Sequence, residues 1–372
     1  MNIPFNKPLK NNNQNIYKLV EKNNFFSGDG PFTKKCHDWL ENYYGSKALI
    51  TTSGTHSLEI TALLCDIKVG DEVIMPSYTF VSTANAFVNF GAKIKFVDIV
   101  PSSMNIDPDL IEKAITKKTK AIVVVHYGGV ACDMDSIVRI AKKYNLFLIE
   151  DAAQAINSEY KGRKLGTIGD FGCLSFHESK NIHCGEGGAL LINNEKYIER
   201  AEIIREKGTN RSKFFRGQVD KYRWVDVGSS YLPGELSAAF LSAQLDEAAD
   251  ITKRKLDVWK KYHENFEDLE VCEKVRRPII PKECQHNGHI YYLILNKKYN
   301  RDSILRNLRD CGVYAVFHYQ PLHSSPAGKK YGTYTQTLPV TEDISERIIR
   351  LPMWIGFDQH EKVNEALIKS LT

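Results

Sequence analysis

The chain has 372 residues, 42% of them apolar and 26% charged, and its 50 lysines and arginines against 45 aspartates and glutamates give a formal net charge of +5. These proportions are typical of a globular protein; the length predicts two domains, and the charge is too dilute to favour nucleic-acid binding. No stretch approaches the roughly 20 apolar residues that span a bilayer, the first 14 residues lack the apolar run of a secretory signal, and the eight cysteines are scattered, so we expect reduced thiols in the cytoplasm and no membrane insertion.

Short β-rich runs alternate with helix-like segments in the first half of the chain. The strand-like runs are 72–77, 93–99, 121–129 and 146–153. Asp107 followed by Pro108 predicts a helix start, because the first residue type caps a helix and the second suits its first position. Apolar residues at helical spacing predict another helix over 134–145. This alternation predicts an α/β fold with a mostly parallel sheet covered on both faces.

After about residue 245 the pattern becomes α+β. Residues 251–269 are typical of a long charged helix, and the rest predicts a strand at 289–296, a helix at 302–312 and a strand at 313–319. We therefore predict a large domain over 1–245 and a smaller C-terminal domain over 246–372.

Common nucleotide and metal motifs are absent from the sequence. It contains no GxGxxG and no GxxxxGK[ST] pattern. His318 and His323 have no third ligand at regular spacing, so we expect no metal site.

Two segments have the character of a ligand site. Residues 51–59 form a Ser/Gly/Thr turn before a helix, whose N–H groups and hydroxyls suit a phosphate; a simple helix cap is the alternative. Residues 146–154 end a buried strand with an acidic pair that includes Asp151. Ligands of open α/β sheets bind at the carboxyl ends of strands, so this carboxylate can hold a cationic ring nitrogen, or it can cap a helix.

Two further side chains suggest a cofactor. Lys180 follows Ser175 by five residues, between two strand-like runs and before a Gly-rich turn. A lysine among apolar neighbours has a lowered pKa and can form an imine, whereas most lysines are solvated surface residues. Phe80 lies just past a strand end, where it can stack on a planar cofactor or pack in the core.

In this order, the segments resemble the sugar aminotransferase family (DegT/DnrJ/EryC1/StrS type), pyridoxal-phosphate enzymes that aminate nucleotide-linked keto sugars. The resemblance covers nearly the whole chain, through residues 3–8, 27–47, 70–86, 150–154, 175–181, 185–190, 317–323 and 350–354. Within the family, 75–88, 205–222 and 227–232 look most similar to dTDP-4-amino-4,6-dideoxygalactose transaminases. The resemblance implies a fold-type-I aminotransferase that works as a homodimer with active sites at the subunit interface.

The resemblance also implies residue roles. Lys180 matches the lysine that forms a Schiff base with pyridoxal 5'-phosphate, and Asp151 the carboxylate that pairs with the pyridine nitrogen; these two are the expected catalytic residues. Relatives with His in place of the lysine perform dehydration, so Lys180 favours transamination. The other cofactor-binding positions are Phe80 on the ring face, Gln154 near the 3-hydroxyl, Gly54, Thr55 and Ser175 at the phosphate, and Ser230 where the family often has an Asn from the neighbouring subunit.

The implied reaction moves an amino group from L-glutamate to C4 of a dTDP-linked 4-keto-6-deoxy sugar, giving dTDP-4-amino-4,6-dideoxygalactose for surface polysaccharide such as O-antigen. The alternatives are the C4 gluco epimer, amination at C3, and a non-catalytic relative that only binds cofactor or sugar nucleotide.

Residues 205–223 contain seven basic and two acidic residues and so carry a net charge equal to that of the whole chain. Because the substrate carries a diphosphate, we predict that this segment binds it, across the dimer interface; a solvated basic loop is the alternative. The expected substrate-binding residues are Arg211, Arg216 and Lys221 in this segment and, at the entrance from the small domain, His318, Tyr319 and His323.

Overall fold

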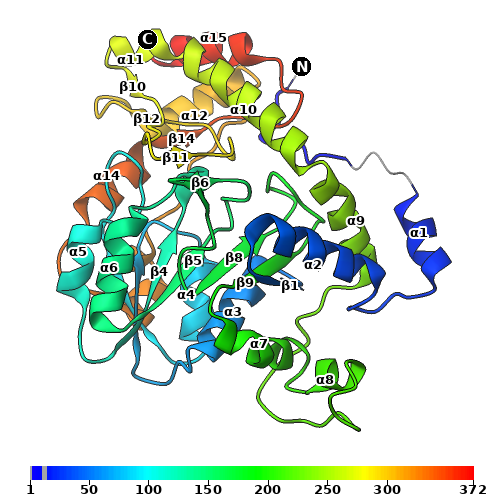
Figure 1. The fold of residues 1–372 in the computed structure, drawn as a ribbon. Helices are drawn as coiled ribbons and strands as arrows, with labels where there is room; N and C mark the ends of the chain where they lie inside the picture. The colour runs from blue at the N-terminus through cyan, green and yellow to red at the C-terminus, as the bar shows by residue number, and fades with distance from the viewer. Residues whose placement is uncertain (1, 11–14) are drawn as a thin grey trace.

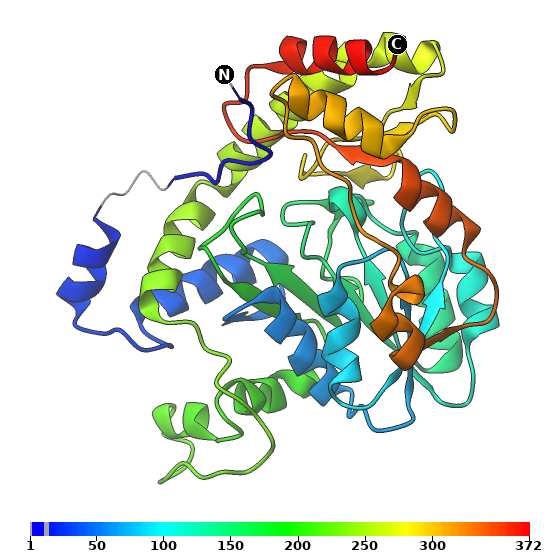
Figure 2. The ribbon, with the colours of Figure 1, turned by 180° about the vertical axis from the view of Figure 1, so that it is seen from behind.

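The computed structural model describes residues 2–10 and 15–372, so the expectation drawn from the first 14 residues falls partly outside the described residues. A large α/β body carries a smaller group of helices and short strands on one side (Figures 1 and 2). Among the described residues, no helix has both the length and the apolar character needed to cross a bilayer.

An eight-stranded sheet forms the centre of the large body. Strand β9 is antiparallel to both of its neighbours, and every other adjacent pair is parallel, so the prediction of a mostly parallel sheet is confirmed. The strands, in spatial order, are β1 (Lys47–Thr51), β9 (Gly188–Ile192), β8 (Phe171–Ser175), β5 (Phe147–Asp151), β4 (Thr119–Val125), β2 (Glu72–Pro76), β3 (Lys93–Val97) and β13 (Gly332–Tyr334).

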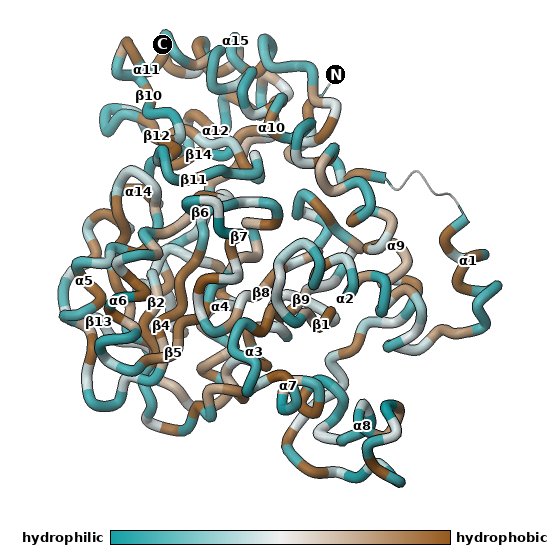
Figure 3. The backbone as a smooth tube through the Cα atoms, viewed as in Figure 1, coloured by the Kyte–Doolittle hydropathy of each residue, from teal (hydrophilic) through white to brown (hydrophobic). Residues whose placement is uncertain are grey.

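Helices cover both faces of this sheet because alternate strand residues point to opposite sides. On β2, Ile74 faces one apolar core while Val73 and Met75 face the other. The central strands are apolar on both sides (Figure 3). The first face is covered by α2 (Pro31–Tyr44), α5 (Pro108–Ala114), α6 (Met134–Tyr144) and α9 (Glu235–Asp246), and the second by α3 (Gly54–Leu64), α4 (Val81–Val88) and α7 (Ile198–Arg205).

The small body has its own apolar core and an antiparallel sheet in the order β10 (Val275–Arg276), β12 (Tyr292–Leu295) and β14 (Ile348–Arg350). Ile3 from the N-terminal segment is buried in this core and bridges to Val313. The helices around it are α10 (Ala248–Asn265), α11 (Glu267–Val271), α12 (Arg301–Asp310) and α15 (His360–Ser370).

Parts of the C-terminal third of the chain return to the large body both before and after α12. Strand β13 pairs with β3 at the edge of the large sheet, and β11 (Cys284–Gln285) pairs with β6 (Glu159–Tyr160). The predicted boundary falls beside the α9–α10 junction, but pieces of 246–372 pack on the large body, and the two-domain division stays a prediction. The other elements are β7 (Arg163–Lys164), α1 (Ile16–Asn23), α8 (Arg211–Phe215), α13 (Pro326–Tyr331), α14 (Pro339–Arg347) and the 3-10 turns Tyr127–Gly129, Glu195–Tyr197 and Leu322–Ser324.

The predicted strand at 313–319 is wrong. This stretch makes only isolated bridges, Val313 with Ile3 and Val316 with Arg350. The chain crosses here from the small body to the large one, so it runs beside no partner strand for more than one residue. Its last residues, His318 and Tyr319, are instead held by side-chain contacts at the edge of the large sheet.

A substitution of Gly188, at the start of β9, tests how closely the sheet packs against α3. A Cβ atom there would lie 2.4 Å from the carbonyl carbon of Ser53 and 2.5 Å from the nitrogen of Gly54, both backbone atoms that cannot swing away. We expect Gly188→Ala to lower the free energy of unfolding by about 1–3 kcal/mol, measured by urea denaturation. In the control Gly234→Ala, the nearest atom to the added methyl is 3.4 Å away, and stability should change by a few tenths of a kcal/mol. Equal stability of both variants would contradict the close approach.

Candidate active site

The segments that follow β2, β4, β5 and β8 meet at one edge of the sheet, because parallel strands end on the same side. They carry Phe80, Tyr127, Asp151 and Lys180 respectively. Residues 317–323 lie against this edge, where the Leu322 N–H donates to the Ser77 carbonyl at 3.0 Å. The structure therefore brings the predicted lysine, carboxylate and aromatic ring together between the two bodies.

Asp151 is a buried carboxylate that accepts hydrogen bonds only from neutral donors. Oδ2 accepts from the Thr83 hydroxyl at 2.8 Å, and Oδ1 accepts from the Ala153 N–H at 3.2 Å. Burial raises the pKa of Asp151, while these hydrogen bonds and the charge of Lys180 act in the opposite direction. Among the described residues, β5 is followed directly by β6 with no helix between them, so the helix-cap alternative fails. A cationic ligand is the partner that this carboxylate still lacks among the described residues.

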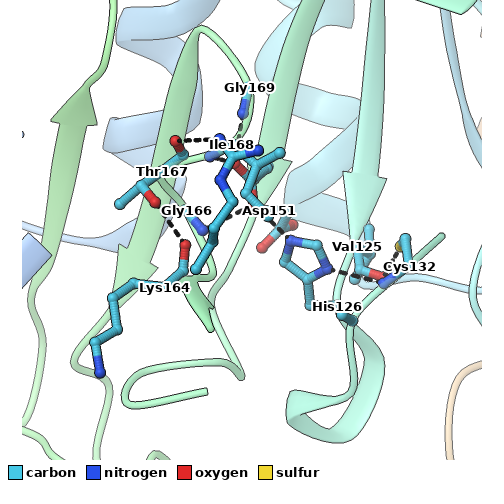
Figure 4. Close-up of polar contacts among 12 residues, drawn as sticks. Val125, His126, Cys132, Asp151, Lys164, Gly166, Thr167, Ile168 and Gly169 are labelled. Carbon is cyan, nitrogen blue, oxygen red and sulfur yellow. Dashed lines mark hydrogen bonds and ion pairs between the residues drawn. The ribbon is translucent and has the colours of Figure 1, made fainter. Parts of the chain in front are cut away.

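The preceding carboxylate, Glu150, is bound on every side. Its oxygens accept from the N–H groups of Gly166, Ile168 and Gly169 at 2.5–2.8 Å and from His126 Nε2 at 2.9 Å (Figure 4). Burial opposes the charge, but the hydrogen bonds prevail and lower the pKa of Glu150. His126 Nδ1 accepts from the Cys132 N–H, which assigns the ring proton to Nε2. Glu150 is thus a structural anion that fixes the loop after β7 and the end of β4.

Lys180 lies after β8, and its main-chain N–H donates to the His177 carbonyl at 2.9 Å. Burial lowers the pKa of Lys180 to about 8, with Asp151 raising it and Arg350 lowering it further. A larger share of its amine is therefore neutral near pH 7.5 than for a solvated lysine, as nucleophilic attack requires. The surface-lysine alternative is contradicted.

The N-terminus of α3 forms the opposite end of the site. Ser53 caps the helix by accepting from the His56 N–H at 3.1 Å, and Thr55 donates to Ser82 at 2.8 Å. A Cβ on Gly54 would lie 2.9 Å from Cβ of Ser175, so glycine permits the approach of α3 to the end of β8. The helix N-terminus, two hydroxyls and this bare glycine together form a cradle for an anion.

Aromatic side chains form the wall between these ends. Phe80 is 56% exposed, which contradicts the core-packing alternative, and its ring lies 6.4 Å from that of Tyr319. Gln154 is fixed by two bonds: Oε1 accepts from the Gly128 N–H at 2.7 Å, and Nε2 donates to the Tyr319 hydroxyl at 2.6 Å. His318 stacks on Tyr319 at 3.8 Å and bonds to the Tyr127 hydroxyl through Nδ1 at 2.5 Å. His318 and Tyr319 thus line this aromatic wall rather than an open entrance.

His323 does not offer a ring nitrogen to a substrate. Nδ1 bonds to the Ser77 hydroxyl at 2.7 Å, and Nε2 lies 3.2 Å from Glu342. The imidazole therefore ties the segment after β2 to α14, and we correct its expected substrate-binding role to a structural one.

The basic segment lies far from this edge within one chain, on the projecting α8 region (Figure 1). Five of its seven basic side chains face a carboxylate, in the pairs Arg205–Asp29, Lys207–Glu206, Arg211–Glu206, Lys213–Glu199 and Arg216–Glu202. Three of these carboxylates, Asp29, Glu199 and Glu202, lie outside 205–223 and balance part of its surplus charge. Lys221 is exposed and has no ion pair among the described residues. The substrate-binding roles of Arg211, Arg216 and Lys221 remain predictions.

Ser230 is exposed beside a segment that supports the anion cradle. The neighbouring Tyr231 carbonyl accepts from the Thr52 N–H at 3.0 Å, and its ring packs 5.0 Å from that of His56. Its predicted contact with a cofactor phosphate in a partner subunit remains untested.

Sequence reasoning missed three residues of the site. Thr83 lies one helical turn after Thr79, and the two hydroxyls bond at 2.8 Å; this spacing was visible in the sequence. Tyr127 follows the end of β4 and could have been found by the same strand-end rule as Asp151. Arg350 lies on β14, far along the chain, and nothing in its local sequence indicates that it comes near Lys180.

The two neighbouring carboxylates give opposite predictions for stability. Glu150→Gln should lower the free energy of unfolding by about 3 kcal/mol or more at pH 7, because it replaces a buried carboxylate that accepts from four donors and leaves some of them without a partner. Asp151→Asn should leave the cofactor-free protein equally or more stable, since it removes a buried charge that burial disfavours. Urea denaturation measures both, and similar losses in the two variants would contradict these roles.

The pH dependence supplies a check with a definite sign. The pKa of Glu150 is lowered in the folded protein, so its stabilisation is present above the unfolded value of about 4.5 and is lost as pH falls through the lower folded value. The deficit of Glu150→Gln should therefore shrink below about pH 4.5. The pKa of Asp151 is raised, so any gain from Asp151→Asn should be present at neutral pH and disappear as pH falls through the folded value.

Comparison with known proteins places this site in a family. A model described as the DegT/DnrJ/EryC1/StrS aminotransferase family matches residues 8–368. An uncharacterized protein of Methanocaldococcus jannaschii is 39% identical over 333 residues, 87% of this chain and 86% of that protein. GDP-perosamine synthase of Escherichia coli O157:H7 is 32% identical over 341 residues, 91% of this chain and 89% of that one.

Comparison with solved structures also indicates an aminotransferase. The crystal structure of the aminotransferase TlmJ from Streptoalloteichus hindustanus matches with a TM-score of 0.90 at 27% identity, covering 100% of this chain and 99% of that chain. The chain belongs to the DegT/DnrJ/EryC1/StrS aminotransferase family, and it is a pyridoxal-phosphate-dependent sugar aminotransferase.

Proposed function

We propose that this enzyme transfers an amino group from L-glutamate to C4 of dTDP-4-keto-6-deoxyglucose, giving dTDP-4-amino-4,6-dideoxygalactose for a surface polysaccharide. The observation that carries amino transfer is the meeting of Lys180, with its lowered pKa, and the buried Asp151 at one sheet edge. The name of the relative GDP-perosamine synthase supports a nucleotide-linked sugar as substrate. The dTDP group and the galacto product rest on the resemblance of 75–88, 205–222 and 227–232.

The residues present fit pyridoxal phosphate. Asp151 offers a buried carboxylate without a cationic partner to the protonated ring nitrogen, and Phe80 offers an exposed ring face. Gly54 lets Ser175 approach the N-terminus of α3, whose N–H groups and neighbouring hydroxyls suit a phosphate. When bound, the cofactor supplies an electron sink for a carbanion next to the amine.

The chain's own contribution is to bind, orient and move protons. Lys180 Nζ would hold the cofactor covalently and, when its amine is free, is the base that carries the proton of the reacting carbon. Asp151, once it faces a ring cation, is favoured in its ionised form and keeps that nitrogen protonated. The neutral His318, whose pKa burial lowers, and Tyr319 provide hydrogen-bonding groups near the sugar.

We also propose that the enzyme is a cytoplasmic homodimer. Large apolar side chains are exposed on the projecting α1 and α8 regions, among them Tyr17 at 58%, Phe215 at 69% and Trp224 at 80%. A second copy that covered them would place the α8 region and Ser230 near the partner's site. All eight cysteines carry free thiols, which suits a reducing compartment.

Lys180 and Asp151 give the first test of the mechanism. Lys180→Ala should abolish turnover and the absorbance band of the covalently bound cofactor. Asp151→Asn should still bind cofactor but lose most of the rate, because the ring nitrogen loses its counter-charge. Absorbance spectra and steady-state kinetics measure both; full activity in either variant contradicts the assigned role.

Arg211 and Arg216 test the basic segment. Arg211→Ala should raise the KM for the sugar nucleotide by roughly 10-fold or more, the effect of a lost charge-assisted hydrogen bond, and should spare the glutamate half-reaction. Arg216→Ala should raise this KM less, because Arg216 is held by two hydrogen bonds to Glu202. Lys213→Ala, in an exposed pair with Glu199, is the control. An unchanged KM in both arginine variants would mean that the segment does not bind the diphosphate.

Product analysis decides between the proposed reaction and its alternatives. With dTDP-4-keto-6-deoxyglucose and L-glutamate, NMR should show an axial amine at C4. An equatorial C4 amine or a C3 amine identifies the related enzymes. A yellow protein whose band does not change on addition of glutamate identifies a binding protein without turnover.

A further inference from the structure

Arg350, at the end of β14, has no carboxylate partner among the described residues. Its main chain is fixed by two hydrogen bonds with Val316, at 2.7 and 3.0 Å. The guanidinium lies over the ring of Phe5, 4.9 Å from its centroid. Nε is buried without any hydrogen-bond partner, while the residue as a whole keeps part of its surface accessible.

Three other shielded arginines of this chain are paired with carboxylates, whereas Arg276 donates to the carbonyl of Pro101. Arg205 Nη1 lies 2.8 Å from Asp29, Arg277 Nε lies 2.7 Å from Glu270, and Arg347 bonds to Asp343. A shielded cation without an anion costs several kcal/mol, because its hydration is lost and nothing replaces it. The position of Arg350 therefore calls for an anion that is not part of the chain.

The surroundings of Arg350 supply no such anion. The groups that act on its charge are Tyr78, Tyr127 and Tyr319, and burial raises the pKa of each of these phenols, so they are neutral near pH 7. Its positive charge also reaches Lys180, whose pKa it helps to lower. The guanidinium is therefore within electrostatic range of Lys180, and the Val316 that fixes its main chain lies two residues before His318 in the aromatic wall of the site.

We propose that Arg350 binds the α-carboxylate of the amino donor through its planar, two-pronged guanidinium. This inference rests on the proposed function and names a residue for one of its two substrates. The donor's amine must reach the position that Lys180 serves, and its α-carboxylate is one carbon away, so an arginine near that lysine meets this carboxylate. Guanidinium and carboxylate match geometrically in two parallel hydrogen bonds.

The keto sugar has no carboxylate, so Arg350 should act on one half of the reaction only. In the first half it orients the donor's α-carbon toward Lys180. In the second half it faces a neutral sugar ring and contributes little. Removing Arg350 should therefore slow the half-reaction with the amino donor and leave the half-reaction with the keto sugar nearly unchanged.

The first experiment measures binding without turnover. Glutarate, a dicarboxylate without an amine, is titrated into cofactor-free wild type, Arg350→Gln and Arg350→Lys, with the thermal midpoint as readout. We expect glutarate to stabilise the wild type and its apparent affinity to fall roughly 10- to 100-fold in both variants, since lysine keeps the charge but not the two-pronged geometry. Arg309→Gln is the control: Arg309 also lies over an aromatic ring, that of Tyr314, but it is exposed and outside the site.

The second experiment uses the holoenzyme and follows each half-reaction by the cofactor's absorbance. Arg350→Gln should lower kcat/KM for L-glutamate roughly 10- to 100-fold and leave the reaction of the aminated enzyme with the keto sugar within about twofold of wild type. Arg350→Lys gives the same comparison if the glutamine variant folds poorly.

Wild-type glutarate affinity in both variants, or an equal loss in the two half-reactions, overturns the assignment. If the wild type transfers no amino group to any keto sugar, the proposed function fails, and glutarate binding still decides the role of Arg350 by itself.

Discussion

The site depends on the hydrogen bonds that hold the ionised side chain of Glu150. One donor from His126 and three from the 166–169 loop surround this buried charge, at the point where β4 and β5 end. Successive residues of a strand point to opposite faces, so fixing Glu150 on one side of β5 fixes Asp151 on the other. Asp151, the proposed catalytic carboxylate, is therefore oriented by its neighbour and needs few bonds of its own.

This division of labour explains why two adjacent acids differ so much. Glu150 receives enough hydrogen bonds to stay charged despite burial, whereas Asp151 receives two from neutral donors and its pKa is raised. Among the described residues, the protein thus leaves Asp151 short of a cation and Arg350 short of an anion, and the charges of both act on Lys180. A cofactor with a cationic ring and a donor with a carboxylate complete both, which links binding of the two ligands to relief of buried charge.

Local sequence was enough for the elements whose signal is local. The strands β2 to β5, the helix capped by Asp107 and the residues Lys180 and Asp151 follow from apolar runs, caps and the rule that ligands bind at strand ends. A phosphate site at 51–59 and a stacking role for Phe80 were each one of two alternatives from local sequence, whereas the role of Gln154 came from the family resemblance alone. What failed depends on contacts between distant segments: β13 pairs with β3 across more than 200 residues, and His323 is occupied by Ser77, 246 residues away. No local pattern encodes such a partner.

Local sequence also does not show which carboxylates pair with the basic segment. In the structure, Arg211 and Arg216 differ in how firmly they are held by their partners. Arg216 is bonded through two nitrogens to Glu202, whose side chain is only 12% exposed, so moving the arginine to a diphosphate would leave a shielded carboxylate unpaired. Arg211 shares Glu206 with Lys207, which lies 3.0 Å from the same oxygen and can remain there when the arginine leaves. The Arg211 side chain is 44% exposed and Glu206 keeps Lys207 as a partner, so Arg211 can change partner at small cost. If a diphosphate binds to this region, Arg211 and the unpaired Lys221 are therefore better placed to receive it than Arg216, although a charge count along the chain treats all three alike.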